Sequence, residues 1–141
     1  MGRLKRDDSR SEIVTVRVHP KMRYGLELIA RKAGMSLSDV ALLTLGRLTE
    51  TDSNKPQIKK LRGDLTPDLL EDLWHADPIE RFVRLAILGN DLLTDSERKI
   101  WNRIIKDPRF WNPAYDPHAE GGELFRYLDL KELRDKWDEV S

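Results

Sequence analysis

The stretch EIVTVRVHP, Glu12 to Pro20, has the alternation of a half-buried β-strand. Val14, Val16 and Val18 occupy every second position, so extended backbone places their side chains on one face. The remaining periodic segments have helical spacing, so no second strand is predicted in the chain. Because a single strand leaves its backbone N–H and C=O groups unpaired, this stretch predicts a partner outside its own chain.

Two helices are predicted directly after the strand. Pro20 fits the first turn of a helix, and Gly34 fits the position just after its last turn. Ser36 is the expected N-cap of the next helix, with Asp39 three residues later as in a capping box. This second helix is apolar around much of its circumference, which a two-helix monomer cannot bury. A second copy would cover that surface and pair with the strand, so we predict an intertwined homodimer.

The alternation also assigns the two faces of the strand. Burying Arg17 beneath a pair of strands would cost several kcal/mol, because the charge would have no partner there. We therefore predict that the valine face packs on the helices and that the opposite face, Ile13, Thr15 and Arg17, points outward. The predicted dimer core comprises Val14, Val16, Val18, Leu26, Ile29, Val40 and Leu45.

The segment VTVRVHPKMRYGLELIARKAGMSLSDVALLTL resembles the ribbon-helix-helix family of DNA-binding proteins, which includes the Arc and methionine repressors. The resemblance lies in the order strand, tight turn, helix, glycine, Ser-x-Ser, helix, and it extends from Ile13 to about Leu48. It implies a mainly α fold: a dimeric N-terminal unit with a two-stranded antiparallel ribbon in the major groove, followed here by an all-α C-terminal region.

The resemblance places base contacts on Ile13, Thr15 and Arg17. Arg17 can donate two hydrogen bonds to guanine, and Thr15 offers a hydroxyl to a base edge and a methyl to thymine. Ile13 departs from the family pattern, which is usually polar or basic there, so a thymine contact and simple shielding of the ribbon end both stay open. Phosphate contacts are implied at the start of the second helix, a natural anion site, at Ser36, Leu37 and Ser38.

Charge is distributed unevenly along a chain whose formal net charge is zero. Residues 1–50 contain ten Lys or Arg and six Asp or Glu, a difference of +4, so the remainder sums to −4. A basic N-terminal part suggests a polyanionic partner, although a solvated helix surface would have the same composition. Further phosphate contacts are predicted from the N-terminal residues Arg3, Lys5, Arg6 and Arg10.

The C-terminal region is predicted to be helical. Turn-forming residues 51–58 mark a linker, which divides the chain into a flexible basic arm (1–11), a DNA-binding and dimerisation domain (12–50) and a C-terminal domain (59–141) for oligomerisation, effector or partner binding. Helices are expected to start at Thr66, Asp77 and Thr94, and a last helix to run from about Glu123 to Val140. Three tryptophans are expected in the core, Trp74, Trp101 and Trp137, whereas Trp111 and Tyr115 lie in a loop that could instead face a partner or a small molecule.

No catalytic constellation, cofactor motif or metal-ligand spacing is found, so the chain is not expected to be an enzyme. The sequence has no cysteine, which excludes disulfides and thiolate metal sites, and its three histidines are scattered. Four acidic residues are expected to form a solvated face: Glu71, Asp72, Asp77 and Glu80. No apolar run approaches the ~20 residues of a membrane helix, and a cytoplasmic location is expected.

These features together predict a sequence-specific double-stranded DNA-binding protein of bacterial, phage or plasmid type, most simply a transcriptional repressor that acts by occupying its site. The predicted assembly is a homodimer, with higher oligomers open through the C-terminal helices. Three alternatives remain: an antitoxin whose C-terminal region inhibits a toxin, an accessory factor that binds a plasmid-transfer origin beside a relaxase, and an interaction module that never meets DNA.

Overall fold

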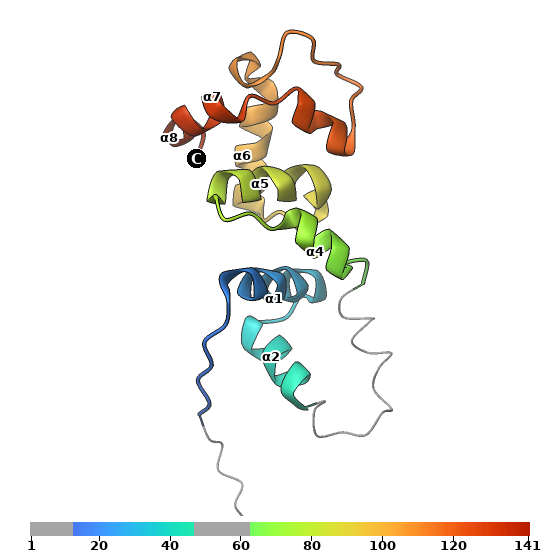
Figure 1. Ribbon diagram of the computed structural model, residues 1–141, viewed down its shortest axis with the longest axis vertical. Helices are drawn as coiled ribbons and strands as arrows, with labels where there is room; N and C mark the ends of the chain where they lie inside the picture. The colour runs from blue at the N-terminus through green and yellow to red at the C-terminus, as the bar shows by residue number, and fades with distance from the viewer. Residues whose placement is uncertain (1–12, 47–62) are drawn as a thin grey trace, which may run out of the picture.

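The computed structural model describes residues 13–46 and 63–141, and every regular element in these ranges is helical (Figure 1). None of the described helices has the length and apolar character needed to cross a membrane. The N-terminal part contains α1 (Pro20–Ala33) and α2 (Leu37–Gly46). The C-terminal part contains α4 (Pro67–Leu73), α5 (Pro78–Leu88), η1 (Asn90–Leu92), α6 (Asp95–Lys106), η2 (Pro108–Phe110), η3 (Gly121–Arg126), α7 (Leu130–Asp135) and α8 (Trp137–Val140).

The predicted starts of five helices are confirmed, because each is set by a local cap. Pro20 is the first residue of α1, and Gly34 ends the helix with a left-handed φ of 64°. The Ser36 hydroxyl accepts a hydrogen bond from the Asp39 N–H at 3.1 Å at the start of α2. The remaining three starts have side-chain caps at the predicted positions, Thr66, Asp77 and Thr94.

The predicted strand, and with it the ribbon-helix-helix fold class, is contradicted. Residues 13–19 are extended, but they form no strand, and the described part of the chain contains no sheet. No backbone hydrogen bond joins residues 13–18 to another described residue. The physical reason is that alternation gives a segment one apolar face but does not supply a neighbouring strand, and a single strand is not stable by itself. The described architecture is all-α.

The predicted last helix is also wrong in its length. Residues 123–140 are divided among η3, α7 and α8. Asp129 begins a new helix, since its carboxylate accepts a hydrogen bond from the Glu132 N–H at 3.0 Å. Just before it, the Asp129 N–H donates to the Phe110 carbonyl at 2.8 Å, so the backbone bonds to a distant loop instead of continuing the helix.

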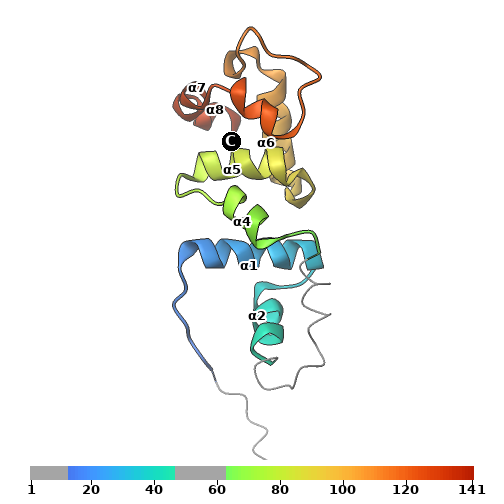
Figure 2. The same ribbon diagram turned by 45° about the vertical axis from the view of Figure 1, so that its right-hand side comes forward.

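Helix α1 lies between α2 on one side and the C-terminal helices on the other (Figures 1 and 2). Leu28 is fully buried and belongs to the same hydrophobic core as α5 and α6. Trp101 and Trp111 are buried in this core, Trp137 packs against it, and Phe110 is completely enclosed. Trp74 differs from the expectation, because it is half-buried beside α1 and outside this core.

An aromatic cluster holds α1 to the C-terminal helices. The Trp74 ring packs on the Tyr24 ring of α1 at 5.8 Å between centroids. The Arg81 guanidinium of α5 lies over both rings, 5.3 Å from the Tyr24 centroid and 4.9 Å from that of Trp74. Burial raises the pKa of Tyr24 to about 12, since an ionised phenol loses its hydration there.

The predicted linker, residues 51–58, lies outside the described residues.

Candidate nucleic-acid interface

The extended segment, residues 13–19, presents every side chain expected to meet bases. It leaves the start of α1 on the same side of that helix as α2, away from the C-terminal helices (Figures 1 and 2). Ile13 is 96% exposed, and Thr15 and Arg17 are exposed as well. Thr15 and Arg17 are two residues apart in extended backbone, so they face the same way.

Arg17 has an electrostatic environment unlike that of the other basic residues in the described range 13–46. Arg23 pairs with Glu27 at 3.1 Å within α1. Arg17 has no ion-pair partner among the described residues. The remaining three cations pair with acids beyond residue 62: Lys21 with Glu71, Arg31 with Glu97 at 3.0 Å, and Lys32 with both Asp64 at 2.9 Å and Asp91 at 3.0 Å.

These contacts pair part of the basic excess in the N-terminal residues with acidic residues of the C-terminal part. Arg31 forms a forked pair with Glu97 and also donates to the Leu92 carbonyl at 3.3 Å. A hydrogen bond donated by the Lys32 ammonium lowers the pKa of the Asp64 carboxyl. Donating to the Asp64 and Asp91 carboxylates in turn raises the pKa of Lys32. Three of the basic residues counted toward a polyanion site are therefore partners of the acidic C-terminal part. Sequence spacing gives no signal for pairs this far apart.

The start of α2 has backbone N–H groups that favour a phosphate and a carboxylate that opposes it. The N–H groups of Leu37 and Ser38 have no acceptor among the described residues, as expected for the first turn of a helix. Ser36 and Ser38 are exposed and Leu37 is half-buried. The Asp39 carboxylate accepts a hydrogen bond from the Ser36 hydroxyl at 2.7 Å, which places a negative charge in the same turn. The other predicted phosphate contacts, Arg3, Lys5, Arg6 and Arg10, lie outside the described residues.

The predicted dimer-core residues are in three different environments. Val14, Val16 and Val18 of the extended segment are 75%, 68% and 41% exposed. Val40 is buried inside the chain. Leu26 and Ile29 are half-buried on a side of α1 that the rest of the described chain does not fully cover, and the side chain of Leu45 lies outside the described residues. The surface predicted for dimerisation is therefore largely uncovered in one copy.

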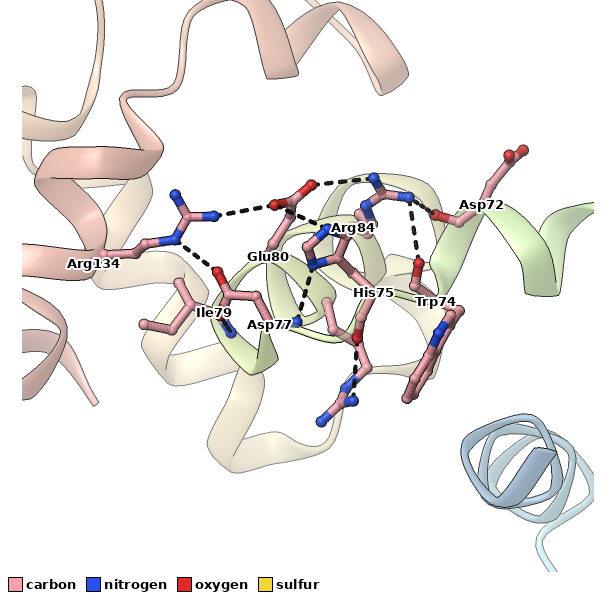
Figure 3. Close-up of polar contacts among 9 residues, drawn as sticks. Asp72, Trp74, His75, Asp77, Ile79, Glu80, Arg84 and Arg134 are labelled. Carbon is pink, nitrogen blue, oxygen red and sulfur yellow. Dashed lines mark hydrogen bonds and ion pairs between the residues drawn. The ribbon is translucent and has the colours of Figure 1, made fainter. Parts of the chain in front are cut away.

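A second polar cluster joins α5 to the turn before it and to α7 (Figure 3). Asp77 and Glu80 were expected on a solvated face, but both are half-buried and paired. Arg134 of α7 donates to Asp77 at 2.7 Å and to Glu80 at 3.1 Å. Arg84 donates to the other Glu80 oxygen at 3.1 Å. The solvated-face prediction is therefore wrong for these two residues.

The same cluster contains the one grouping of metal-ligating side chains among the described residues. His75, Asp77 and Glu80 each have a ligand-type atom, and these atoms lie within 4.8 Å of one another. The Nδ1 atom of His75 is occupied, since it accepts the Asp77 N–H at 3.0 Å. Both carboxylates are bonded to guanidinium groups, whose charge opposes a cation. The cluster is better suited to joining α7 to α5 than to holding a metal.

Asp77 gives the cluster a specific pH dependence. Burial alone would raise the pKa of Asp77, but hydrogen bonds from Arg134 and the Ile79 N–H outweigh burial and hold the pKa below the ordinary value of an aspartate. The depressed pKa of Asp77 stabilises the folded chain when the pH is above the pKa of this carboxyl in the unfolded chain. The stabilisation is lost as the pH falls through the pKa of Asp77 in the folded chain. We expect the free energy of unfolding, from urea titrations between pH 7 and about pH 3, to fall less steeply below pH 4 in Asp77→Asn than in the wild type.

Asp72→Asn is the matched control, because Asp72 is exposed and its carboxylate has no partner among the described residues. An Asp77→Asn variant with the same acid slope as the wild type would contradict this assignment.

The aromatic loop does not leave Trp111 open to a ligand. The Trp111 indole N–H donates to the Ile104 carbonyl at 2.8 Å. Its ring packs between those of Trp101 and Tyr115, with centroid distances of 6.3 Å and 4.8 Å. The indole is thus a core residue, although an open polar hollow of about 520 Å³ adjoins it.

No protein-family model, curated protein or solved structure matches this chain.

Proposed function

We propose that the protein is a sequence-specific double-stranded DNA-binding protein that works as a homodimer and represses transcription by occupying its site. The exposure of Arg17 and its lack of an ion pair with the described residues support this proposal most directly. Arg17 is exposed on an extended segment directed away from the acidic C-terminal part, and it has no ion-pair partner among the described residues. An arginine in this state can donate two parallel hydrogen bonds to the O6 and N7 atoms of guanine.

Thr15 strengthens the proposal because it faces the same way as Arg17. Its hydroxyl can bond a base edge and its methyl can contact thymine, so the pair could discriminate two neighbouring base positions. A twofold-symmetric dimer presents this pair twice, which implies a site made of two related half-sites. Repression follows from occupancy, since the proposed contacts require no catalytic group.

The exposed apolar side chains support the homodimer. Val14, Val16 and Met22 are 75%, 68% and 58% exposed, although such residues normally leave water. They belong to one end of α1 and to the segment before it. Covering them with a second copy removes this surface from water and brings two Arg17 side chains into one assembly.

Selection of bound sequences from random double-stranded DNA tests the proposal. We expect the wild-type chain to enrich one motif with two related halves, and guanine to occupy a fixed position in each half. The selection should be run at two salt concentrations, because phosphate contacts weaken with salt while the preferred bases stay the same. Failure to enrich any motif at either concentration would refute sequence-specific DNA binding.

A further inference from the structure

An apolar groove lies between α1 and α4, outside the surface proposed to meet DNA. Its volume is about 450 Å³. It lies along the line where α1 meets α4, so one side comes from each helix. The apolar lining is Met22, Leu26 and Ile29 of α1 with Pro67 and Leu70 of α4, and the polar rim is His19, Lys21 and Glu71.

The same chain has an apolar element without cover. Val14, Val16 and Val18 occupy every second position of the extended segment, and each is at least 41% exposed. A groove that needs filling and an apolar segment that needs burying are thus present together. Their apolar surfaces meet at His19, which ends the segment and also lines the groove.

The segment of one chain is poorly placed to fill the groove of the same chain. His19 has extended backbone, with φ −62° and ψ 142°, and Pro20 follows it directly. The segment consequently leaves α1 on the side of α2, whereas α4 lies on the opposite side of α1 (Figures 1 and 2). Reaching its own groove would require a reversal over the first turn of α1.

The two surfaces have similar lengths. From Met22 to Ile29 the groove follows α1 for about 10 Å, at ~1.5 Å per residue. From Val14 to Val18 the extended segment spans about 13 Å, at ~3.3 Å per residue. If the valines enter a groove, alternation leaves Thr15 and Arg17 on the outer side. In this arrangement the valines make the dimer contact, while Thr15 and Arg17 face away from the groove.

We propose that the groove between α1 and α4 is occupied by residues 13–18 of a second copy of the chain, in a twofold exchange that makes α4 part of the dimer interface. This inference rests on the homodimer in the proposed function and specifies its contacts. It assigns the C-terminal part a direct share in dimerisation through Pro67 and Leu70.

Thiol cross-linking tests the exchange cleanly, because the chain contains no cysteine. A Val16→Cys chain and a Leu70→Cys chain of different tagged length should be co-expressed and treated with a short thiol-to-thiol cross-linker. We expect a product that contains one chain of each length. The matched control replaces Leu70→Cys with Ile105→Cys, since Ile105 is 43% exposed on α6, away from the groove lining, and should give little product.

Two cross-linking results would overturn the exchange. One is a product formed only between two Val16→Cys chains, which would mean that the segments lie against each other. The other is equal product with Leu70→Cys and Ile105→Cys, which would indicate random collision.

Light scattering provides a second measurement that does not depend on cross-linking. Val16→Lys should shift the mass from dimer to monomer while circular dichroism shows the helices intact, because a charge would have to enter the apolar groove. Ile105→Lys should stay dimeric. Three results would overturn the inference. The first is a Val16→Lys chain that stays helical and dimeric, and the second is a wild-type chain that is monomeric at every concentration. The third is a groove that takes only a small apolar ligand.

DNA selection separates this inference from the proposed function. A dimer that cross-links as expected but enriches no motif would uphold the exchange and refute DNA binding. A dimer that enriches a motif but does not form the expected cross-link would uphold DNA binding and refute the exchange.

Discussion

Arg17→Ala is expected to weaken binding to the selected DNA by about 5- to 150-fold per half-site, and to relax the preference at one base position. This range corresponds to the ~1–3 kcal/mol that a two-bond arginine contact contributes to discrimination. The folded chain should be unaffected, since Arg17 is exposed and makes no ion pair with the described residues. Titration of the selected DNA and of single-base variants, followed by fluorescence anisotropy, measures both effects.

Arg126→Ala provides the matched control for this experiment. Arg126 is an exposed arginine on η3 with no ion pair to the described residues, and it lies far along the chain from the extended segment. Its removal changes the net charge equally but should leave the preferred bases unchanged. Equal losses for Arg17→Ala and Arg126→Ala would show that Arg17 contributes charge alone and does not contact a base.

Leu28→Ala is expected to have a large effect on stability, about 2–5 kcal/mol in the free energy of unfolding. This is the usual cost of removing a large buried side chain and leaving a cavity. Leu28 is completely buried, and it comes from α1 while its core neighbours include residues of α5 and α6. Because the cavity would open between the two parts of the chain, urea unfolding should show a single transition at lower urea.

Ile105→Ala removes a side chain of similar size from an exposed position and should change stability by no more than ~0.5 kcal/mol. A Leu28→Ala chain as stable as Ile105→Ala would mean that α1 is not part of the C-terminal core. Two separate transitions in Leu28→Ala would also contradict the prediction, because they would mean that the two parts of the chain unfold independently.

The positions of most helices followed from the sequence because helix ends are local events. A proline at the first turn, a glycine after the last, and a serine, threonine or aspartate cap all act within four residues. The predicted length of the last helix was wrong for the opposite reason. Leu124, Tyr127 and Leu128 have helical spacing, and only contacts with a distant loop interrupt it. Asp129 and Glu132 did offer a cap signal, three residues apart, that could have found the break.

The strand shows the limit of periodicity. Alternation predicted a strand over residues 13–19, but a strand is defined by its neighbour, and the described part of the chain supplies none. The groove between α1 and α4 had no sequence signal at all, because its two sides are separated by the whole predicted linker and come together only by packing.

By itself, the sequence determined where five of the helices begin, because helix caps depend on hydrogen bonds within a few residues. Only the tertiary structure decided which charged side chains pair with one another. Arg31 and Glu97 are 66 positions apart, yet folding brings them to 3.0 Å, and Lys21 and Lys32 are paired in the same way. Arg17 is left without such a partner among the described residues because the extended segment lies on the side of α1 opposite the acidic C-terminal helices.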